Sequence, residues 1–135
     1  MIIMADYIPW EEQELGKTPE AQYDTIACLQ VTKWIHLTAG DEGLKRSFRK
    51  MYRQLKPGGI LLLEAQGWPA YTSAMKLTEK LYQAYQNINF RPEQFNEFLL
   101  SPEVGFSSHT VIGAPIHTSR KSRSSLMYSL SLSLV

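Results

Sequence analysis

The sequence predicts an α/β fold built on a βαβ unit, in which an amphipathic helix joins two parallel strands. Residues 23–29 form a short run rich in β-forming residues, and residues 60–64 form an almost continuous aliphatic run. The second run is typical of a strand buried on both faces of a parallel sheet. Between the two runs, apolar residues recur at helical spacing. Strand, helix and strand within about forty residues indicate a βαβ unit.

The helix expected from about residue 40 has the clearest period in the chain. Its apolar positions form one stripe, made of Leu44, Phe48, Met51, Tyr52 and Leu55. Its opposite face is basic and carries Lys45, Arg46, Arg49, Lys50 and Arg53. Residues 57–59, Pro-Gly-Gly, are expected to end this helix, because proline cannot continue the hydrogen-bond ladder and glycine accepts positive φ angles.

The segments before this helix carry weaker signals. Residues 1–4 have the composition of a strand end. Residues 9–22 contain helix breakers and no clean period, which predicts a loop with a short helical turn. Residues 30–40 are expected to form a loop.

After the second strand, residues 65–69 predict a loop at the carboxyl end of that strand, where open α/β sheets bind their ligands. Two further helices are expected, from about Ala74 to Asn87 and from Pro92 to Leu99. Residues 108–114 predict a strand, and residues 126–134 alternate leucine with serine in the pattern of an edge strand. The segment between them, residues 119–125, predicts a basic, serine-rich loop.

Length and composition fit one ordinary globular domain. The chain has 135 residues, of which 44% are hydrophobic and 20% charged, so we expect it to fold. No apolar run approaches the roughly 20 residues that a membrane-spanning helix needs. The start of the sequence lacks the pattern of a secretory signal, and a single cysteine, Cys28, excludes an internal disulfide and fits a reducing compartment.

The net charge of +1 hides an uneven distribution. Residues 1–32 carry a net charge of −5, and the remainder carries +6. A positive field over the larger part of the chain predicts attraction to a polyanion such as nucleic acid. The alternative interpretation is an ordinary solvated charged face.

The familiar catalytic motifs are missing. The three histidines, His36, His109 and His117, lie far apart in the sequence and have no carboxylate at helical ligand spacing, so we expect no metal site. The sequence contains no Gly-x-Ser-x-Gly elbow, no phosphate-binding Gly-x-x-x-x-Gly-Lys-Ser/Thr loop and no Gly-x-Gly-x-x-Gly turn.

A series of ordered motifs nevertheless resembles a known family. The βαβ unit looks like the fourth strand, the following helix and the fifth strand of class I S-adenosylmethionine-dependent methyltransferases. The more specific likeness is to the Bicoid-interacting family of RNA methyltransferases, over about residues 5–119. It is carried by residues 29–37, 40–44, 57–59, 64–68, 92–95, 101–106 and 117–119.

This resemblance implies a class I, Rossmann-like methyltransferase sheet that lacks its N-terminal strands, so that residues 1–135 form the C-terminal half of a domain. It also implies a nuclear enzyme that transfers a methyl group from S-adenosyl-L-methionine to the γ-phosphate at the 5′ end of a small nuclear RNA. An RNA-binding protein of the same ribonucleoprotein is the implied protein partner. The alternative is a catalytically inactive remnant that serves as an RNA- or protein-binding module.

For the cofactor, the resemblance implies three contacts. Asp6 and Tyr7 match a pair that borders the adenine after the third strand, with aspartate in place of the family's asparagine. Leu29 matches the leucine that ends the fourth strand against the cofactor. A buried core leucine is the alternative reading of Leu29.

For the RNA, the resemblance places Lys33 at the acceptor phosphate, with His36 assisting as a second catalytic residue. Trp34 and Trp68 are expected to wall the site or to stack on a terminal base. The alternative for Lys33 and His36 is that they are ordinary loop residues. The alternative for Trp34 and Trp68 is that their indole rings belong to the core. A phosphate oxygen is already anionic at neutral pH, so its attack on a sulfonium methyl group requires alignment rather than a general base.

Two features differ from the family pattern. The glycine-rich turn and the ribose-binding acid of the family have no counterpart in these residues, so we expect half of the cofactor pocket to be absent. The family's Glu-Pro-Gln-Pro-Trp reads Glu-Ala-Gln-Gly-Trp at residues 64–68, which loosens a loop that proline would stiffen. The resemblance fades after Ser119, and residues 126–135 are either a divergent last strand or an altered end.

Overall fold

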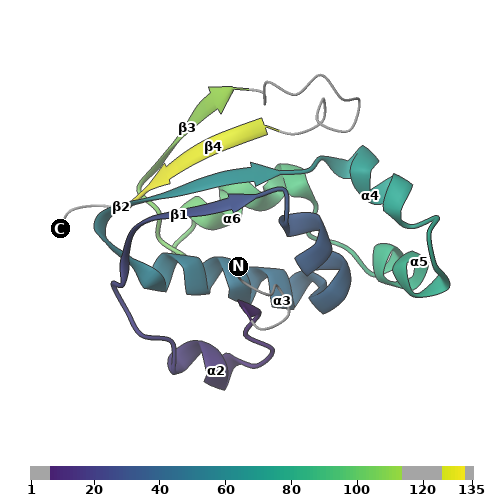
Figure 1. Ribbon diagram of the computed structural model, residues 1–135, viewed down its shortest axis with the longest axis horizontal. Coiled ribbons are helices and arrows are strands. Elements are labelled where there is room, and N and C mark those ends of the chain that lie inside the picture. Colours follow the sequence, from purple (N-terminus) through teal and green to yellow (C-terminus); the bar gives the residue numbers. More distant parts are fainter. Residues whose placement is uncertain (1–6, 114–125, 133–135) are drawn as a thin grey trace.

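The computed structural model describes residues 7–113 and 126–132 (Figure 1). In chain order its elements are α2 (Glu12–Gly16), β1 (Tyr23–Leu29), α3 (Thr32–Gln54), β2 (Leu55–Ala65), α4 (Trp68–Ala74), α5 (Glu79–Gln86), the 3-10 helix η1 (Pro92–Gln94), α6 (Phe95–Leu100), β3 (Ser108–Gly113) and β4 (Leu126–Ser131). The strand end expected at residues 1–4 and the basic loop expected at residues 119–125 lie outside the described residues. Among the described helices, none has the length and apolar character needed to cross a membrane.

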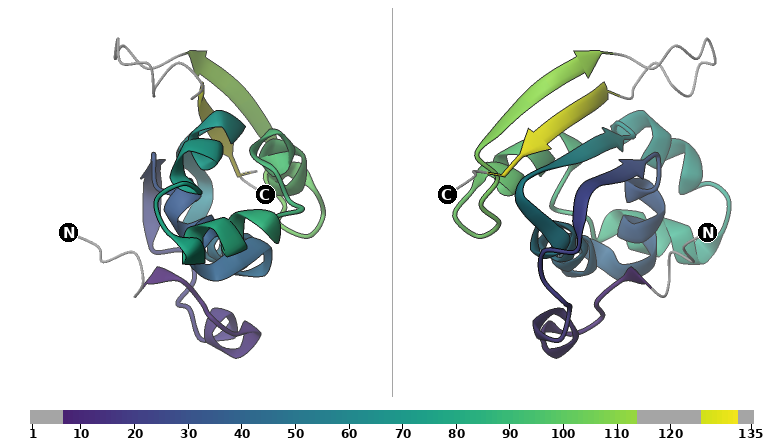
Figure 2. Two further views of the ribbon diagram at one scale, coloured as in Figure 1. Left: turned by 90° about the vertical axis from the view of Figure 1, so that its right-hand side faces the viewer. Right: turned by 60° about the vertical axis from the view of Figure 1, so that its left-hand side comes forward.

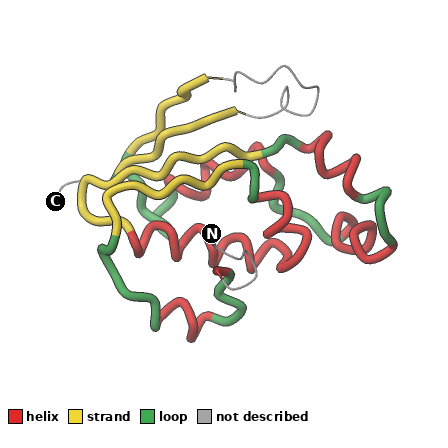
Figure 3. The backbone as a smooth tube through the Cα atoms, viewed as in Figure 1, coloured by secondary structure: helices red, strands yellow, loops and turns green. Residues whose placement is uncertain are grey.

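The four strands form one mixed sheet in the order β1-β2-β4-β3 (Figure 3). β1 and β2 are parallel and are joined through α3, which confirms the predicted βαβ unit. β4 runs antiparallel to both β2 and β3. The leucine–serine segment is therefore an interior strand, and its prediction as an edge strand was wrong. Leucine and serine alternate in this strand because one face of the sheet is covered by helices, where Leu130 is fully buried, and the other face is less covered.

Helices cover one face of the sheet. Leu61 and Leu63 of β2 and Leu130 of β4 are fully buried on that face, against Phe48 of α3 and Phe95 of α6. The opposite face is covered less, since Ile60 and Leu29 there keep 36% and 45% of their surface exposed, although Glu64 near the end of β2 is buried. Among the described residues, the aliphatic run of β2 is therefore fully buried on one face only, and not on both as predicted.

Helix α3 begins earlier than predicted. Residues 32–39 are helical rather than a loop, and Gly40, with φ +75° and ψ −176°, marks a kink between two helical segments. The second segment follows the expected apolar stripe and ends at Gln54. β2 then begins at Leu55, and residues 56–59 bulge out of the β1–β2 register.

The region after β2 also differs from the prediction. Trp68 begins α4, with Pro69 in the first turn, where a missing N–H costs no helical hydrogen bond. The helix expected from Ala74 to Asn87 begins later, at Glu79, because Thr78 caps its start by accepting a hydrogen bond from the Leu81 N–H (3.1 Å). Ala74 instead ends α4, a helix that was not predicted. Helices α4 and α5 extend beyond the carboxyl end of β2 (Figure 1).

Residues 7–22, here called the N-terminal strap, cross the basic face of α3 (Figure 2). Arg46 donates to the Pro9 carbonyl (2.7 Å), Lys50 to the Tyr7 carbonyl (2.7 Å) and Arg53 to the Thr18 carbonyl (2.8 Å). Two acids of the strap form ion pairs with the same face, Glu12 with Arg49 and Glu20 with Arg53. The basic helix face thus binds the acidic N-terminal segment of the same chain, so these cations are not open to the polyanion that the charge distribution predicted.

Candidate functional site

The parallel strands β1 and β2 end side by side, and we call this end of the sheet the carboxyl edge. Leu29, the last residue of β1, pairs with Glu64 near the end of β2. The segments that follow the two strands therefore meet, as expected for the ligand-binding edge of an open α/β sheet. Leu29 is half-exposed on the uncovered face, so among the described residues it is not a buried core leucine and its apolar surface is open. Its contact with the cofactor stays a prediction.

A hydrogen-bonded corner connects the two strand ends. Gln30, directly after β1, has a φ of +57°, a left-handed conformation that is uncommon for a residue with a Cβ atom. Its amide N–H donates to the Glu64 carbonyl (2.8 Å), and its side chain donates to the Glu64 carboxylate (3.1 Å). Gln66, from the segment after β2, donates to the Gln30 carbonyl (2.6 Å). The corner is thus held from both strands.

Lys33 and Trp34 lie in the first turn of α3, immediately after this corner. The ammonium nitrogen of Lys33 lies 4.5 Å from the centroid of the Trp34 ring, within cation–π distance. Trp34 is 37% exposed. The structure therefore brings Lys33, Trp34 and Leu29 together at the carboxyl edge.

His36 is one turn further along the helix and is fully buried. Its Nδ1 lies 2.8 Å from the Tyr71 hydroxyl, and its Nε2 lies 2.6 Å from Asp41 Oδ1. Burial lowers the pKa of His36 more than its contacts with Asp41 raise it, so the ring is neutral near pH 7. In that state Nε2–H donates to Asp41 and Nδ1 accepts from Tyr71. Neither nitrogen is free to contact a phosphate, and the direct catalytic role expected for His36 does not fit the structure.

Trp68 has neighbours on its ring that sequence reasoning did not anticipate. The rings of Tyr71 and Tyr85 stack on it, with centroids at 5.2 and 4.8 Å. The guanidinium carbon of Arg91 lies 4.2 Å from the indole centroid. Trp68 thus anchors the α4–α5 region, and its ring already has three partners within the chain. Its expected role as a wall of the site or as a stacking surface for a base stays a prediction.

Tyr7 faces a different part of the molecule. Its hydroxyl donates to the side chain of Gln54 (2.7 Å), and Lys50 lies over its ring at 4.0 Å. Burial raises the pKa of the Tyr7 hydroxyl. Leu29 points to the uncovered face of the sheet, whereas Tyr7 packs against α3, so the structure does not bring these two residues together. Asp6 lies outside the described residues.

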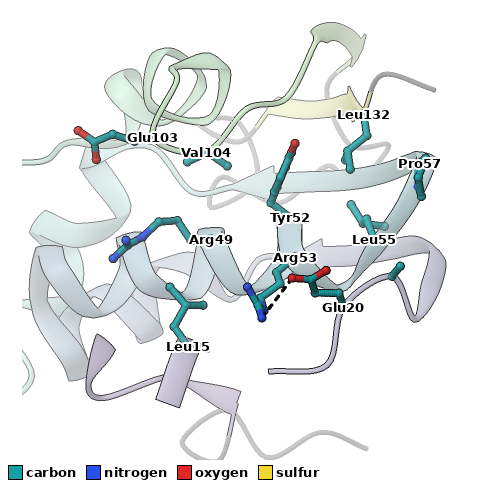
Figure 4. Close-up of a pocket in the computed structure, with 11 residues that line it drawn as sticks. Leu15, Glu20, Arg49, Tyr52, Arg53, Leu55, Pro57, Glu103, Val104 and Leu132 are labelled. Carbon is teal, nitrogen blue, oxygen red and sulfur yellow. Dashed lines mark ion pairs between the residues drawn. The ribbon is translucent and has the colours of Figure 1, made fainter. Parts of the chain in front are cut away.

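A separate cavity of about 500 Å³ lies at the other end of the parallel strands, between the strap, the end of α3 and the start of β2 (Figure 4). Two arginines, Arg49 and Arg53, and two acids, Glu20 and Glu103, contribute to its lining. Arg53 is paired with Glu20 at 3.2 Å. These charges balance, and the cavity is remote from Lys33, so it is not the candidate site.

Four residues near the site were missed from the sequence: Gln30, Gln66, Asp41 and Arg91. Gln30, Asp41 and Gln66 stand in motifs that carry the resemblance, but the motifs did not identify them as site residues. Their partners lie between 5 and 49 residues away, so local patterns do not identify them.

The fold and the carboxyl-edge site define the chain as part of a methyltransferase-like α/β protein. A SAM-dependent methyltransferase from Archaeoglobus fulgidus has a TM-score of 0.54, with 10% identity, over 88% of this chain and 63% of that chain. A SAM-dependent methyltransferase from Thermotoga maritima has a TM-score of 0.54, with 16% identity, over 85% of this chain and 58% of that chain. At these identities the likeness concerns the fold alone.

The chain belongs to the Bicoid-interacting protein 3 (Bin3) family, whose model matches residues 23–129. The match extends past the expected limit at residue 119 and into β4. Residues 126–129 therefore belong to the family domain, which favours the reading of this segment as the last strand.

Sequence relatives agree with this assignment. The 7SK snRNA methylphosphate capping enzyme of Mus musculus is 50% identical over 110 residues, 82% of this chain and 16% of the relative. The human enzyme of the same name is 53% identical over 105 residues, 78% of this chain and 15% of the relative. The U6 snRNA methylphosphate capping enzyme Amus of Drosophila melanogaster is 50% identical over 107 residues, 79% of this chain and 36% of the relative. The chain thus spans between 15% and 36% of the length of these relatives.

Proposed function

We propose that this chain is the RNA-acceptor part of an S-adenosylmethionine-dependent RNA methyltransferase that acts on the γ-phosphate at the 5′ end of a small nuclear RNA. The observation that carries the proposal is the position of Lys33 at the carboxyl edge, beside the exposed Trp34. The names of the 7SK and U6 relatives supply the substrate class.

In this proposal Lys33 orients the terminal phosphates. A lysine is a flexible point charge with three donors, suited to hold a phosphate without fixing a single geometry. Trp34 supplies an exposed aromatic face next to that charge, on which a base can stack. The attacking phosphate oxygen needs no general base, because it is already anionic. The buried His36 acts indirectly, by fixing the first segment of α3 against Asp41 and Tyr71.

S-adenosyl-L-methionine supplies the electrophilic methyl group when it is bound. Of the residues expected to contact it, Leu29 fits best, because its apolar side chain is half-exposed at the end of β1. The Tyr7 side chain is engaged by α3, and the family's glycine-rich turn and ribose-binding acid have no counterpart in the sequence. Leu29 therefore forms one wall of the cofactor site, and the remainder comes from outside the described residues.

The organisation of the domain follows from this arrangement. We propose that residues 1–135 are the C-terminal half of a methyltransferase domain. Within the described residues, β1 is an outer strand and the sheet has one uncovered face with Leu29 and Ile60 exposed. Further strands and helices of the same domain would pair with β1, cover Ile60 and complete the cofactor site around Leu29. We place the protein in the nucleus, with a small nuclear RNA and an RNA-binding protein of that ribonucleoprotein as partners.

A comparison of two RNAs tests the proposal. The chain is titrated with a short labelled RNA that carries either a 5′-triphosphate or a 5′-hydroxyl group. We expect tighter binding of the triphosphate form, and we expect Lys33→Met to remove the difference while the exposed Lys80→Met does not. Equal binding of the two RNAs by the unmodified chain would indicate a general RNA-binding module and would contradict the proposal.

A further inference from the structure

One side chain at the carboxyl edge holds both segments that follow the parallel strands. We propose that Gln66 is a positioning residue that fixes Lys33 for the RNA 5′ end, an inference that rests on the function proposed above for Lys33. Gln66 follows β2, yet every hydrogen bond that its side chain is seen to make reaches the segment after β1.

The amide oxygen of Gln66 binds the first turn of α3. It accepts from the Lys33 backbone N–H (3.3 Å) and from the Thr32 hydroxyl (3.3 Å). The first N–H groups of a helix have no partner within the helix, so a side chain from another segment is a suitable acceptor. Gln66 thereby caps the start of α3 at the residue that carries the candidate phosphate-binding ammonium group.

The amide nitrogen of Gln66 binds the strained corner. It donates to the Gln30 carbonyl at 2.6 Å, and Gln30 has the left-handed φ of +57°. Such a conformation persists only where the surroundings hold it, and it occurs often at functional sites. Gln30 also bonds Glu64 through its N–H and its side chain, so β2 and Gln66 hold both sides of the corner.

Only a side chain that both donates and accepts satisfies the two contacts. Gln66 retains only 8% of its surface exposure, so water does not easily replace either bond. Methionine has nearly the same shape but provides neither a comparable donor nor a comparable acceptor. Without these bonds, only the two hydrogen bonds to Glu64 still hold Gln30, on one side of the corner. We expect the left-handed conformation and the first turn of α3 to become less firmly held. The backbone from which the Lys33 side chain extends then loses the hydrogen bond that holds it at the carboxyl edge.

Hydrogen exchange tests this link directly on the 135-residue chain. We expect Gln66→Met to speed exchange of the Lys33 amide at least tenfold, while the Leu63 amide in the core strand is unchanged and reports that the protein remains folded. Gln83→Met is the matched control, because the Gln83 amide bonds only Glu79 on the surface of α5. If Gln66→Met fails to fold, Gln66→Glu keeps the acceptor and loses the donor to Gln30, and we expect the same direction of change.

A second measurement separates this inference from the proposed function. For each variant, the affinity ratio of 5′-triphosphate to 5′-hydroxyl RNA is measured. We expect Gln66→Met to lower that ratio at least fivefold and Gln83→Met to leave it unchanged, because a merely structural role would weaken both RNAs alike. A wild-type ratio of one would overturn the proposed function. The role of Gln66 would be overturned if the wild-type protein prefers 5′-triphosphate RNA and Gln66→Met keeps the same affinity ratio. It would also be overturned if Gln66→Met leaves the exchange rate of the Lys33 amide unchanged.

Discussion

The Nε2 atom of His36 lies 2.6 Å from Oδ1 of Asp41, across the kink at Gly40. Residues five apart on an unbroken α-helix point about 140° away from each other. The non-helical backbone of Gly40 removes this separation and allows the two side chains to meet. Asp41 also accepts from the N–H groups of Asn89 and Phe90, at 2.9 and 3.2 Å, so one carboxylate connects α3 to the segment before η1.

Replacing Asp41 tests the importance of this carboxylate for stability. In Asp41→Asn, an amide NH₂ group opposes at least one of the donors that the carboxylate now satisfies. We expect the free energy of unfolding to fall by about 2 kcal/mol, within the range for a buried donor left without a partner. Asp24→Asn is the control, because the Asp24 side chain is 88% exposed and 4.0 Å from Lys56. Urea titrations that give equal losses for the two variants would contradict the role of Asp41.

The kink itself depends on glycine. Gly40 has φ +75° with ψ −176°, a region that is almost exclusive to glycine, although a Cβ atom there would meet no neighbour within 4 Å. Gly40→Ala is therefore expected to cost about 1–3 kcal/mol through backbone strain alone. Gly16 also has no neighbour within 4 Å of the position that a Cβ atom would take, but its φ is not positive, so Gly16→Ala should change the stability little. Thermal unfolding measures both variants. A Gly40→Ala protein as stable as the unmodified chain would show that the kink does not need glycine.

The buried His36 predicts a loss of stability in mild acid. Burial lowers the pKa of His36 below its ordinary value of 6.5, so the unfolded chain takes up a proton at higher pH than the folded chain does. The free energy of unfolding should therefore fall as the pH drops below about 6.5. Urea midpoints at pH 7.5 and 5.5 measure this fall. In His36→Gln the fall should be smaller, and an identical fall in both proteins would assign it to other groups.

The strap predicts that stability and RNA binding depend on different cations. Arg53 donates to the Thr18 and Gly16 carbonyls (2.8 and 3.3 Å), so Arg53→Met should lower the free energy of unfolding by about 1 kcal/mol. The affinity for 5′-triphosphate RNA should stay within about twofold, because the strap already covers this face. Lys33→Met should instead lower the affinity for 5′-triphosphate RNA and leave the free energy of unfolding almost unchanged. A large loss of RNA affinity in Arg53→Met would return the basic face of α3 to the RNA-binding surface.

Sequence reasoning predicted the elements that local patterns define. β1 has the predicted limits, and the apolar stripe from Leu44 to Met51 lies in the core. The helical segment before Gly40 was missed because the kink interrupts the apolar period on which its detection depended. The leucine–serine alternation predicted a strand, which is present as β4, and an edge position, which was wrong. It did not indicate position in the sheet, since an interior strand with one open face has the same pattern.

The candidate site was less predictable because its chemistry depends on distant partners. The structure places Leu29, Lys33 and Trp34 together, since the end of a strand and the start of the next helix are adjacent in sequence. The environment of His36 depends on Tyr71, 35 residues away, and sequence alone gave no indication that both ring nitrogens are engaged. The corner at Gln30 likewise depends on Glu64 and Gln66 of another strand.

The most direct test of the central claim is methyl transfer from labelled S-adenosyl-L-methionine to RNA. The chain is assayed alone and joined to the segment that precedes the matched residues in the mouse relative. We predict no transfer by the chain alone, which should bind the cofactor weakly or not at all. The joined protein should methylate 5′-triphosphate RNA, should leave 5′-hydroxyl RNA unmodified, and should lose activity in Lys33→Met. Cofactor binding by the joined protein without any transfer to 5′-triphosphate RNA, or transfer that ignores the 5′ group, would contradict the account.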